Sequence, residues 1–183
     1  MADLATPPVT WAVTPKGLMS PLLYDEVVAL CTLAYEEDST ALMSTFHGSV
    51  HVLGSQAGQL VTHALWVARW LQAGSNPPMR TAFVEAVATR PDCQRQGLGR
   101  RVMQRITAEV GARDFELAAL GPADVDWYSR LGWERWRGPL SLRTGTGLVA
   151  TPGEEVMVHR LPRTPPLDLS LPLSAEEREG EQW

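Results

Sequence analysis

The sequence contains few of the residues that cross-link a small fold or bind a metal ion. Two cysteines and four histidines are present among its 183 residues. Cys31 lies in a helical pattern and Cys93 in a loop, so the pair indicates no disulfide framework, and we expect a reducing compartment. His47 and His51 have the interval of a metal-binding helix, but they flank a glycine and a strand-like run. We therefore expect no metal.

Long apolar runs are also absent, and none approaches the length of a membrane-spanning helix. Residues 1–4 show no basic region followed by an apolar run, as a signal peptide would. We expect a cytoplasmic protein without a membrane partner. A chain of this length can bury a core without cross-links, and no repeat or linker divides it. A single domain over residues 1–183 is therefore expected.

The formal net charge of −5 argues against non-specific nucleic-acid binding, so no nucleic-acid partner is expected. The arginines cluster between Arg90 and Arg113, whereas residues 176–181 are acidic. This distribution suits an anionic cofactor and a cationic small-molecule substrate. A solvated acidic tail is the alternative for the second region.

Hydrophobic periodicity predicts an α/β fold. Apolar alternation or short apolar runs indicate strands at residues 9–13, 49–53, 60–70, 81–89, 115–120, 133–136, 156–161 and 167–173. Helical spacing indicates helices at residues 21–35, 98–110 and 124–131. Loops or turns are expected at residues 36–40, 72–80 and 143–153. Residues 175–183 form an acidic segment with an exposed-looking aromatic, Trp183. This segment is expected either to stay solvated or to be anchored by burial of the Trp183 ring, which would present its carboxylate.

The chain is organised around residues 81–111, which read as a strand, a glycine-containing loop and an amphipathic helix. Apolar residues recur four apart from Leu98 to Val110, and Gly111 ends the pattern. The preceding loop, residues 94–99, reads Gln-Arg-Gln-Gly-Leu-Gly. Free N–H groups, the positive end of the helix dipole and nearby arginines suit a phosphate or pyrophosphate. An ordinary glycine-rich turn is the alternative.

Glu85 is unusual because it shares a strand face with Phe83 and Val87, within the most apolar strand of the chain. A carboxylate there is costly unless it has a partner or faces a cavity. We interpret Glu85 as a general base or as an anchor for a substrate amine. A structural ion pair or an exposed edge position is the alternative.

Tyr128 lies in a short helical segment between Trp127 and the pair Gly132 and Trp133. A phenol, with a reference pKa of about 10, can donate its proton to a developing thiolate. The alternative is that Tyr128 only packs in an amphipathic helix.

Two common phosphate motifs do not fit the loop, since Val102 replaces the third glycine of a dinucleotide fingerprint and no Gly-Lys-Ser/Thr follows. The loop does fit Gln/Arg-x-x-Gly-x-Gly/Ala, and together with the aromatic-Tyr segment before Gly132 it resembles the GNAT acetyltransferases. The resemblance implies an α/β GNAT fold, with a mixed, mostly antiparallel sheet flanked by helices and splayed for acetyl-CoA. It implies that Tyr128 protonates the departing thiolate. The acetyl-CoA-binding residues that it implies are Val87, Ala88, Gln94, Arg95, Gln96, Gly97, Leu98, Gly99 and Arg100.

Several stretches are similar more narrowly to the aminoglycoside 2′-N-acetyltransferases, namely residues 83–88, 128–141, 169–171 and 181–183. In that family, carboxylates hold the aminoglycoside amines. Carried onto this chain, they are Glu85, Glu181 and the carboxylate of Trp183, with Asp38, Glu154 and Glu155 as weaker matches. Residues 121–123 read Gly-Pro-Ala where the family has serines, which puts the substrate hydroxyl contacts there in doubt. The resemblance also implies a homodimer.

Together with this resemblance, these features predict direct acetyl transfer from acetyl-CoA to the 2′-amine of an aminoglycoside, without a covalent enzyme intermediate. Glu85 is the expected base, acting through a water. A GNAT enzyme acting on a peptide N-terminus or a polyamine is one alternative, and a non-catalytic acyl-CoA sensor is another. Glu85 and Tyr128 argue against the sensor, since binding alone requires neither.

Overall fold

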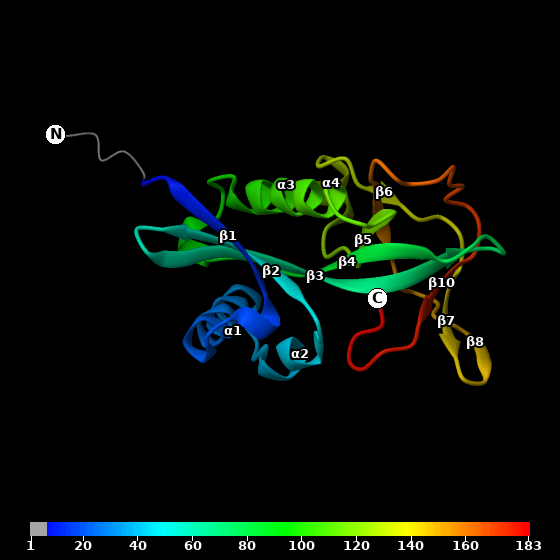
Figure 1. Cartoon of the computed structure of the whole chain (residues 1–183), viewed down its shortest axis with the longest axis horizontal. Coiled ribbons are helices and arrows are strands. Elements are labelled where there is room, and N and C mark those ends of the chain that lie inside the picture. Colours follow the sequence, from blue (N-terminus) through cyan, green and yellow to red (C-terminus); the bar gives the residue numbers. More distant parts are fainter. Residues whose placement is uncertain (1–6) are drawn as a thin grey trace.

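The structure is a computed structural model that describes residues 7–183, and Figure 1 shows its course. Residues 1–4, considered above for a signal peptide, lie outside the described residues. Four α-helices are formed: α1 (Pro21–Tyr35), α2 (Thr40–Thr45), α3 (Leu98–Gly111) and α4 (Val125–Ser129). The strands are β1 (Val9–Pro15), β2 (Val50–Gln56), β3 (Gln59–Ala73), β4 (Met79–Thr89), β5 (Leu117–Leu120), β6 (Glu134–Arg135), β7 (Leu140–Thr144), β8 (Gly147–Ala150), β9 (Met157–Arg160) and β10 (Leu173–Glu176).

The strands form one mixed, mostly antiparallel sheet in the order β6-β9-β5-β4-β3-β10-β7-β8, with β2 also paired to β3 and β1 to β2. Helix α3 covers one face, and α1 and α2 lie on the other (Figure 1). No helix within residues 7–183 has the length and apolarity needed to cross a membrane. The expected α/β fold, with a mixed, mostly antiparallel sheet flanked by helices, is confirmed.

The alternation of side chains along β3 and β4 divides the core between the two faces of the sheet. Leu65 and Phe83 pack toward α1, with Val27 and Cys31. Their neighbours on the other face pack against the buried stripe of α3, which consists of Leu98, Val102, Met103, Ile106 and Val110. Each fully buried side chain of this size contributes roughly 1.5–3 kcal/mol. The two layers hold β4 rigidly between α1 and α3.

The sheet opens beside β4. Its parallel pairing with β5 is confined to Thr81, Ala82 and Phe83, opposite residues 117–119. Strand β4 then continues to Thr89, whereas β5 ends at Leu120 and the chain turns into α4. Among residues 7–183, no strand pairs with the second half of β4 on that side, and the sheet is splayed there as expected.

Three local expectations are corrected by the structure. Residues 167–172 are irregular and contain a turn, because Asp168 accepts hydrogen bonds from the backbone and hydroxyl of Ser170 and because Pro172 has no N–H to donate. The strand there is β10, which begins at Leu173. Residues 143–153, expected to be a loop, include the end of β7 and all of β8 as a hairpin. Helix α2 was not predicted from the sequence.

Candidate active site

The loop before α3 is shaped by backbone conformations that expose its N–H groups. Gly97 has a φ of 77° and Arg95 a φ of 61°, so the chain turns sharply before the helix begins. The first helical hydrogen bond runs from the N–H of Arg101 to the carbonyl of Gly97. The preceding N–H groups of the first turn consequently have no helical partner, and they lie at the positive end of the dipole.

A cavity of about 450 Å³ lies over this loop and ends at α4. We call it the donor cavity. Its lining includes most of the predicted acetyl-CoA-binding residues, namely Val87, Gln94, Arg95, Gly97, Leu98, Gly99 and Arg100. Ala88 and Gln96 are not among the lining residues. The sequence pattern missed Thr89, at the end of β4, and Ala123, Asp124 and Trp127, at the start of α4 and just before it.

The donor cavity suits a phosphate-bearing ligand. A Cβ at Gly97 would meet nothing within 4 Å, so open space lies beside the backbone there. A Cβ at Gly99 would lie 3.3 Å from the Trp127 ring, which shows how closely α3 approaches α4. Arg95 and Arg100 supply positive charge, and the carboxylate of Asp124 is occupied as the cap of α4.

Strand β4 contains a bulge at the point where the sheet opens. Glu85 pairs with Leu65 and Ala88 with His63, so Ala86 and Val87 together face one residue of β3. Ala86 accordingly has a φ of 51°. The bulge carbonyls are held by side chains. His63 Nδ1 donates to Ala86 at 2.8 Å, and the Tyr35 hydroxyl donates to Val87 at 3.1 Å.

A second cavity, of about 240 Å³, adjoins the donor cavity, and we call it the acceptor cavity. Val87, Ala123 and Tyr128 line both. The acceptor cavity brings together the predicted residues Glu85, Tyr128 and Glu181, which come from β4, α4 and the C-terminal segment. It is completed by Tyr35, Glu37, Leu42, Phe46, Val84, Ala86 and Gly121.

Glu85 both faces a cavity and forms an ion pair, which are the two interpretations that its sequence context left open. The carboxylate lines the acceptor cavity, and its Oε1 also forms an ion pair with Nη2 of Arg178. The residue is 9% exposed. Burial raises the pKa of Glu85 to about 7, the charge of Arg178 opposes this rise, and Glu181 adds to it. A carboxyl group with such a pKa can exchange a proton near neutral pH.

Tyr128 is buried on α4, with its ring edge-on to Trp127 and Trp133 at centroid distances of 4.7 and 6.2 Å. Burial, together with the negative charge of Glu85, raises the pKa of Tyr128 to about 12. The phenol is therefore protonated at neutral pH. Its hydroxyl forms no hydrogen bond with residues 7–183, so the proton is available to a ligand at the junction of the two cavities.

The C-terminal segment is anchored in the sheet, which places Glu181 at the acceptor cavity. Buried Arg69 of β3 donates to the carbonyls of Glu176 and Gln182 at 2.6 and 2.5 Å. The indole of Trp183 donates to the Thr151 hydroxyl at 2.9 Å. Trp183 is 6% exposed, so its ring is buried and anchors the segment, as in the second of the two expectations for this residue. Its backbone carbonyl carbon would lie 3.1 Å from a Cβ at position 121, where the chain has glycine.

Three carboxylates predicted to bind the substrate are placed elsewhere. Asp38 is exposed, and its Oδ1 accepts a hydrogen bond from the N–H of Thr40 at the start of α2. Glu154 is exposed, and Glu155 forms an ion pair with Arg135. None of the three lines the acceptor cavity, and neither does Trp183, although its carbonyl group lies beside Gly121 of the lining. Glu37, next to Asp38, does line this cavity.

Two buried histidines lie behind the bulge, with His51 Nδ1 and His63 Nε2 2.9 Å apart. Burial lowers the pKa of His51 to about 4 and that of His63 to about 3. Cys31 lies 3.8 Å from His63, and burial raises the pKa of its thiol to about 12. This cluster is thus uncharged at neutral pH. Within residues 7–183, no three His, Cys, Asp or Glu side chains are grouped as they would be around a metal ion.

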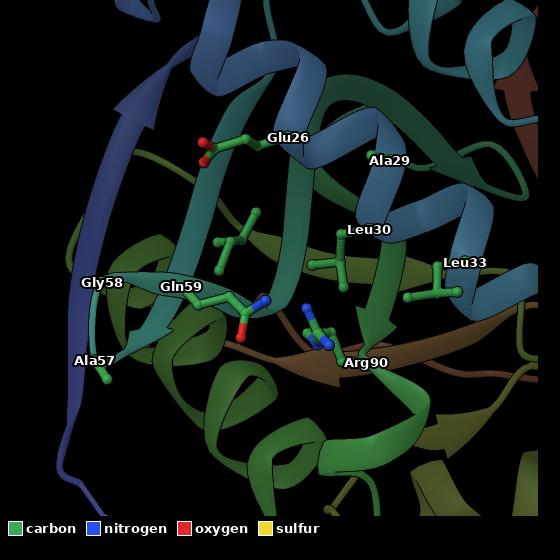
Figure 2. Close-up of a pocket in the computed structure, with 9 residues that line it drawn as sticks. Glu26, Ala29, Leu30, Leu33, Ala57, Gly58, Gln59 and Arg90 are labelled. Atoms are coloured by element: carbon green, nitrogen blue, oxygen red, sulfur yellow. The ribbon is translucent and has the colours of Figure 1, made fainter.

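Another cavity, of about 450 Å³, opens between α1 and the β2–β3 hairpin (Figure 2). Leu30 and Leu33 extend into it from α1, opposite Gln59 and Arg90. Within the described part of the chain, it shares no lining residue with the donor or acceptor cavity. The guanidinium of Arg90 is already paired with Asp92. This cavity is therefore separate from the site that contains Glu85 and Tyr128.

The acetyltransferase (GNAT) domain family matches residues 23–136, more than half of the chain. The chain therefore belongs to the GNAT acetyltransferases, enzymes that use an acyl-CoA donor.

The aminoglycoside 2′-N-acetyltransferase of Mycolicibacterium fortuitum is 32% identical over 142 residues, covering 74% of this chain and 72% of that protein. Among solved structures, GNAT family N-acetyltransferase YhbS from Escherichia coli, in complex with CoA, has a TM-score of 0.64 at 16% identity, over 94% of this chain and 92% of that chain. Escherichia coli ElaA has a TM-score of 0.60 at 12% identity, over 84% and 100%.

Proposed function

We propose that this protein is an aminoglycoside N-acetyltransferase that transfers the acetyl group of acetyl-CoA to the 2′-amine of the drug and so confers resistance. The observation that carries the proposal is the acidic acceptor cavity beside the donor cavity, to which Glu37, Glu85 and Glu181 contribute. A polycationic sugar is the kind of substrate that such a cavity attracts. Similarity to an aminoglycoside 2′-N-acetyltransferase at 32% identity supports the same substrate.

On the donor side, the backbone N–H groups of residues 94–100 would hold the CoA pyrophosphate, with Arg95 and Arg100 adding charge. Gly97 allows this approach, because glycine adopts a φ of 77° at little cost, whereas a residue with a side chain would be strained there. The N–H groups of Val87 and Ala88, at the bulge, would hold the thioester carbonyl. Fixing the carbonyl beside the acceptor cavity orients it toward the incoming amine.

On the acceptor side, an amine with a Lys-like pKa of about 10.4 would cost roughly 4–5 kcal/mol to neutralise at pH 7. Amino-sugar amines are less basic, but an acidic cavity favours their charged form. A base must therefore take the proton as the new bond forms, and we assign this role to Glu85, acting through a water. Tyr128 would give its proton to the departing thiolate.

An acetylation assay that detects free thiol tests the proposal. The acceptors are two aminoglycosides that differ only in an amine or a hydroxyl at position 2′, a polyamine and a short peptide. We expect rapid thiol release with the 2′-amine drug alone and strongly reduced release from the Glu85→Gln variant. Turnover of only the polyamine or the peptide would assign the enzyme to another amine. CoA binding without turnover of any acceptor would indicate a sensor.

We further propose that the enzyme acts in the cytoplasm as a homodimer. The resemblance to the aminoglycoside 2′-N-acetyltransferases motivates the dimer, and the two cysteines outside any disulfide fit a reducing compartment. Light scattering coupled to size exclusion measures the mass directly. A species of 20.1 kDa, the mass of one chain, would contradict the dimer.

A further inference from the structure

Arg178 reaches from the C-terminal segment to the carboxylate of Glu85, 93 residues away in the chain. The guanidinium carbon also lies 5.4 Å from the Phe83 ring centre and 5.9 Å from that of Phe46. Its Nε donates to the carbonyl of Glu181. The side chains of Arg178 and Glu85 are only 16% and 10% exposed, so solvent screens their pairing weakly. The guanidinium is thus held in place by Glu85, by the carbonyl of Glu181 and by two aromatic rings.

The backbone that carries Arg178 is fixed as well. The Gln182 side chain accepts from the N–H of Arg178 at 3.1 Å and donates to its carbonyl at 2.6 Å. Arg69 binds the carbonyl of Gln182, and Gly180, with a φ of 77°, packs on Thr45 of α2. Both the N–H and the carbonyl of Arg178 are therefore hydrogen-bonded, which is not expected of an arginine on a mobile surface segment. The segment therefore presents a cation to Glu85 as part of the fold.

The ion pair occupies one oxygen of Glu85 and leaves the other open. Oε1 accepts from Arg178, whereas Oε2 accepts no hydrogen bond from the part of the chain that the structure describes. We propose that Arg178 is a positioning residue, which holds Glu85 as a carboxylate with one oxygen bound and the other available to the acceptor amine or its water. The inference rests on the proposed role of Glu85 as the base.

Several groups surround Glu85 and decide whether it is charged. Arg178 and Glu181 face it from the C-terminal segment, Arg69 from β3, Tyr35 from α1 and Tyr128 from α4. Glu37 also lines the acceptor cavity. Burial and the acidic neighbours favour the protonated carboxyl, while the two arginines favour the carboxylate. Removal of Arg178 should consequently raise the pKa of Glu85, and the base would be lost at neutral pH.

The test compares the pH dependence of kcat/KM in the wild type and in Arg178→Met, which keeps an aliphatic stem against Phe46 and Phe83. The acidic limb is the part of the pH profile in which kcat/KM falls as Glu85 becomes protonated. In Arg178→Met we expect this limb to move up by about one pH unit. On the acidic side, kcat/KM of this variant should then be about tenfold lower than that of the wild type, and it should recover at high pH. Arg178→Lys retains the charge and should return the limb toward its wild-type position. Arg163→Gln, which removes an exposed pair with Asp114, is the matched control.

A second readout needs no acceptor. The carboxyl carbon of Glu85, assigned in ¹³C spectra with the Glu85→Gln variant, should titrate about one unit higher in Arg178→Met. If the methionine variant does not fold, Arg178→Gln, which can still donate to Glu85 but has no charge, serves in its place. A uniform loss of activity with an unmoved limb and an unmoved carbon titration would overturn the inference. A moved titration with an unmoved limb would support it and instead contradict Glu85 as the base.

Discussion

His63 donates its Nδ1 proton to the carbonyl of Ala86 at 2.8 Å, and Ala86 is the residue of β4 that adopts a φ of 51°. A non-glycine residue in this region of backbone space is strained and persists only when its surroundings fix it. The partner ring, His51, lies 2.9 Å from the other nitrogen of His63 and sets its tautomer. A buried side chain of the adjacent strand thereby holds the bulge that separates the two cavities.

We predict that His63→Leu lowers kcat by one to two orders of magnitude, roughly the effect of misplacing a carbonyl-binding N–H group. The KM for the acceptor should change less, since Glu85 and Glu181 remain in place. His159→Leu is the control, because that ring lies near Gly132, away from the bulge. A wild-type kcat in folded His63→Leu would show that the bulge keeps its shape without the histidine.

Gly97→Asp should abolish measurable acetyl-CoA binding, because its side chain adds volume and negative charge where the pyrophosphate is proposed to lie. Gly58→Asp is a closely matched control. Gly58 has a φ of 80°, similar to the 77° of Gly97, and a Cβ at either position meets nothing within 4 Å. Calorimetry with acetyl-CoA measures the affinities. Equal affinity in the two variants would remove the loop from the binding site.

Tyr128→Phe should lower kcat by about 10²-fold, the lower end of what a positioned general acid supplies, while the KM for acetyl-CoA stays nearly unchanged. The packing of the ring against Trp127 and Trp133 is retained in this variant, so its stability should be close to that of the wild type. Steady-state kinetics and a thermal melt test both parts. Unreduced turnover would mean that Tyr128 only packs, or that water supplies the proton.

Glu181→Gln should raise the aminoglycoside KM by one to two orders of magnitude, since a charge-assisted hydrogen bond contributes about 1.5–3 kcal/mol. The KM for acetyl-CoA should not change. Glu179→Gln is the matched control in the same segment, because Glu179 faces exposed His47 and does not line the acceptor cavity. If both variants had the wild-type KM for every drug tested, Glu181 would have no part in substrate binding.

Local sequence signals were sufficient for the central part of the fold. The apolar spacing from Leu98 to Val110 defines α3, and the glycine pattern places the loop at its start, because helix periodicity and left-handed backbone preferences act within a few residues. A carboxylate in an apolar strand also indicated that Glu85 meets a cavity or a partner. These features depend on residue type and near neighbours alone.

Other features depend on which segments pack together, and short-range patterns do not encode that. The leucine alternation at residues 167–173 is typical of a strand, yet Asp168 and Pro172 make turns there, and the chain pairs only from Leu173. From the sequence, Trp183 could be exposed or could anchor its segment, and the contacts of Arg69 and Thr151 with residues 182 and 183 decide for the anchor. An apolar side chain near a terminus is buried only if the rest of the fold offers it a surface.

The sequence by itself determined the strand, loop and helix that form the donor cavity, and the types of residue that carry the proposed chemistry. Only the tertiary structure decided that Glu85, Tyr128 and Glu181 share one cavity and that Arg178 is paired with Glu85. The reason is physical. The ionisation of a carboxyl depends first on its burial and then on the charges within a few ångströms of it, and here the paired cation comes from 93 residues along the chain.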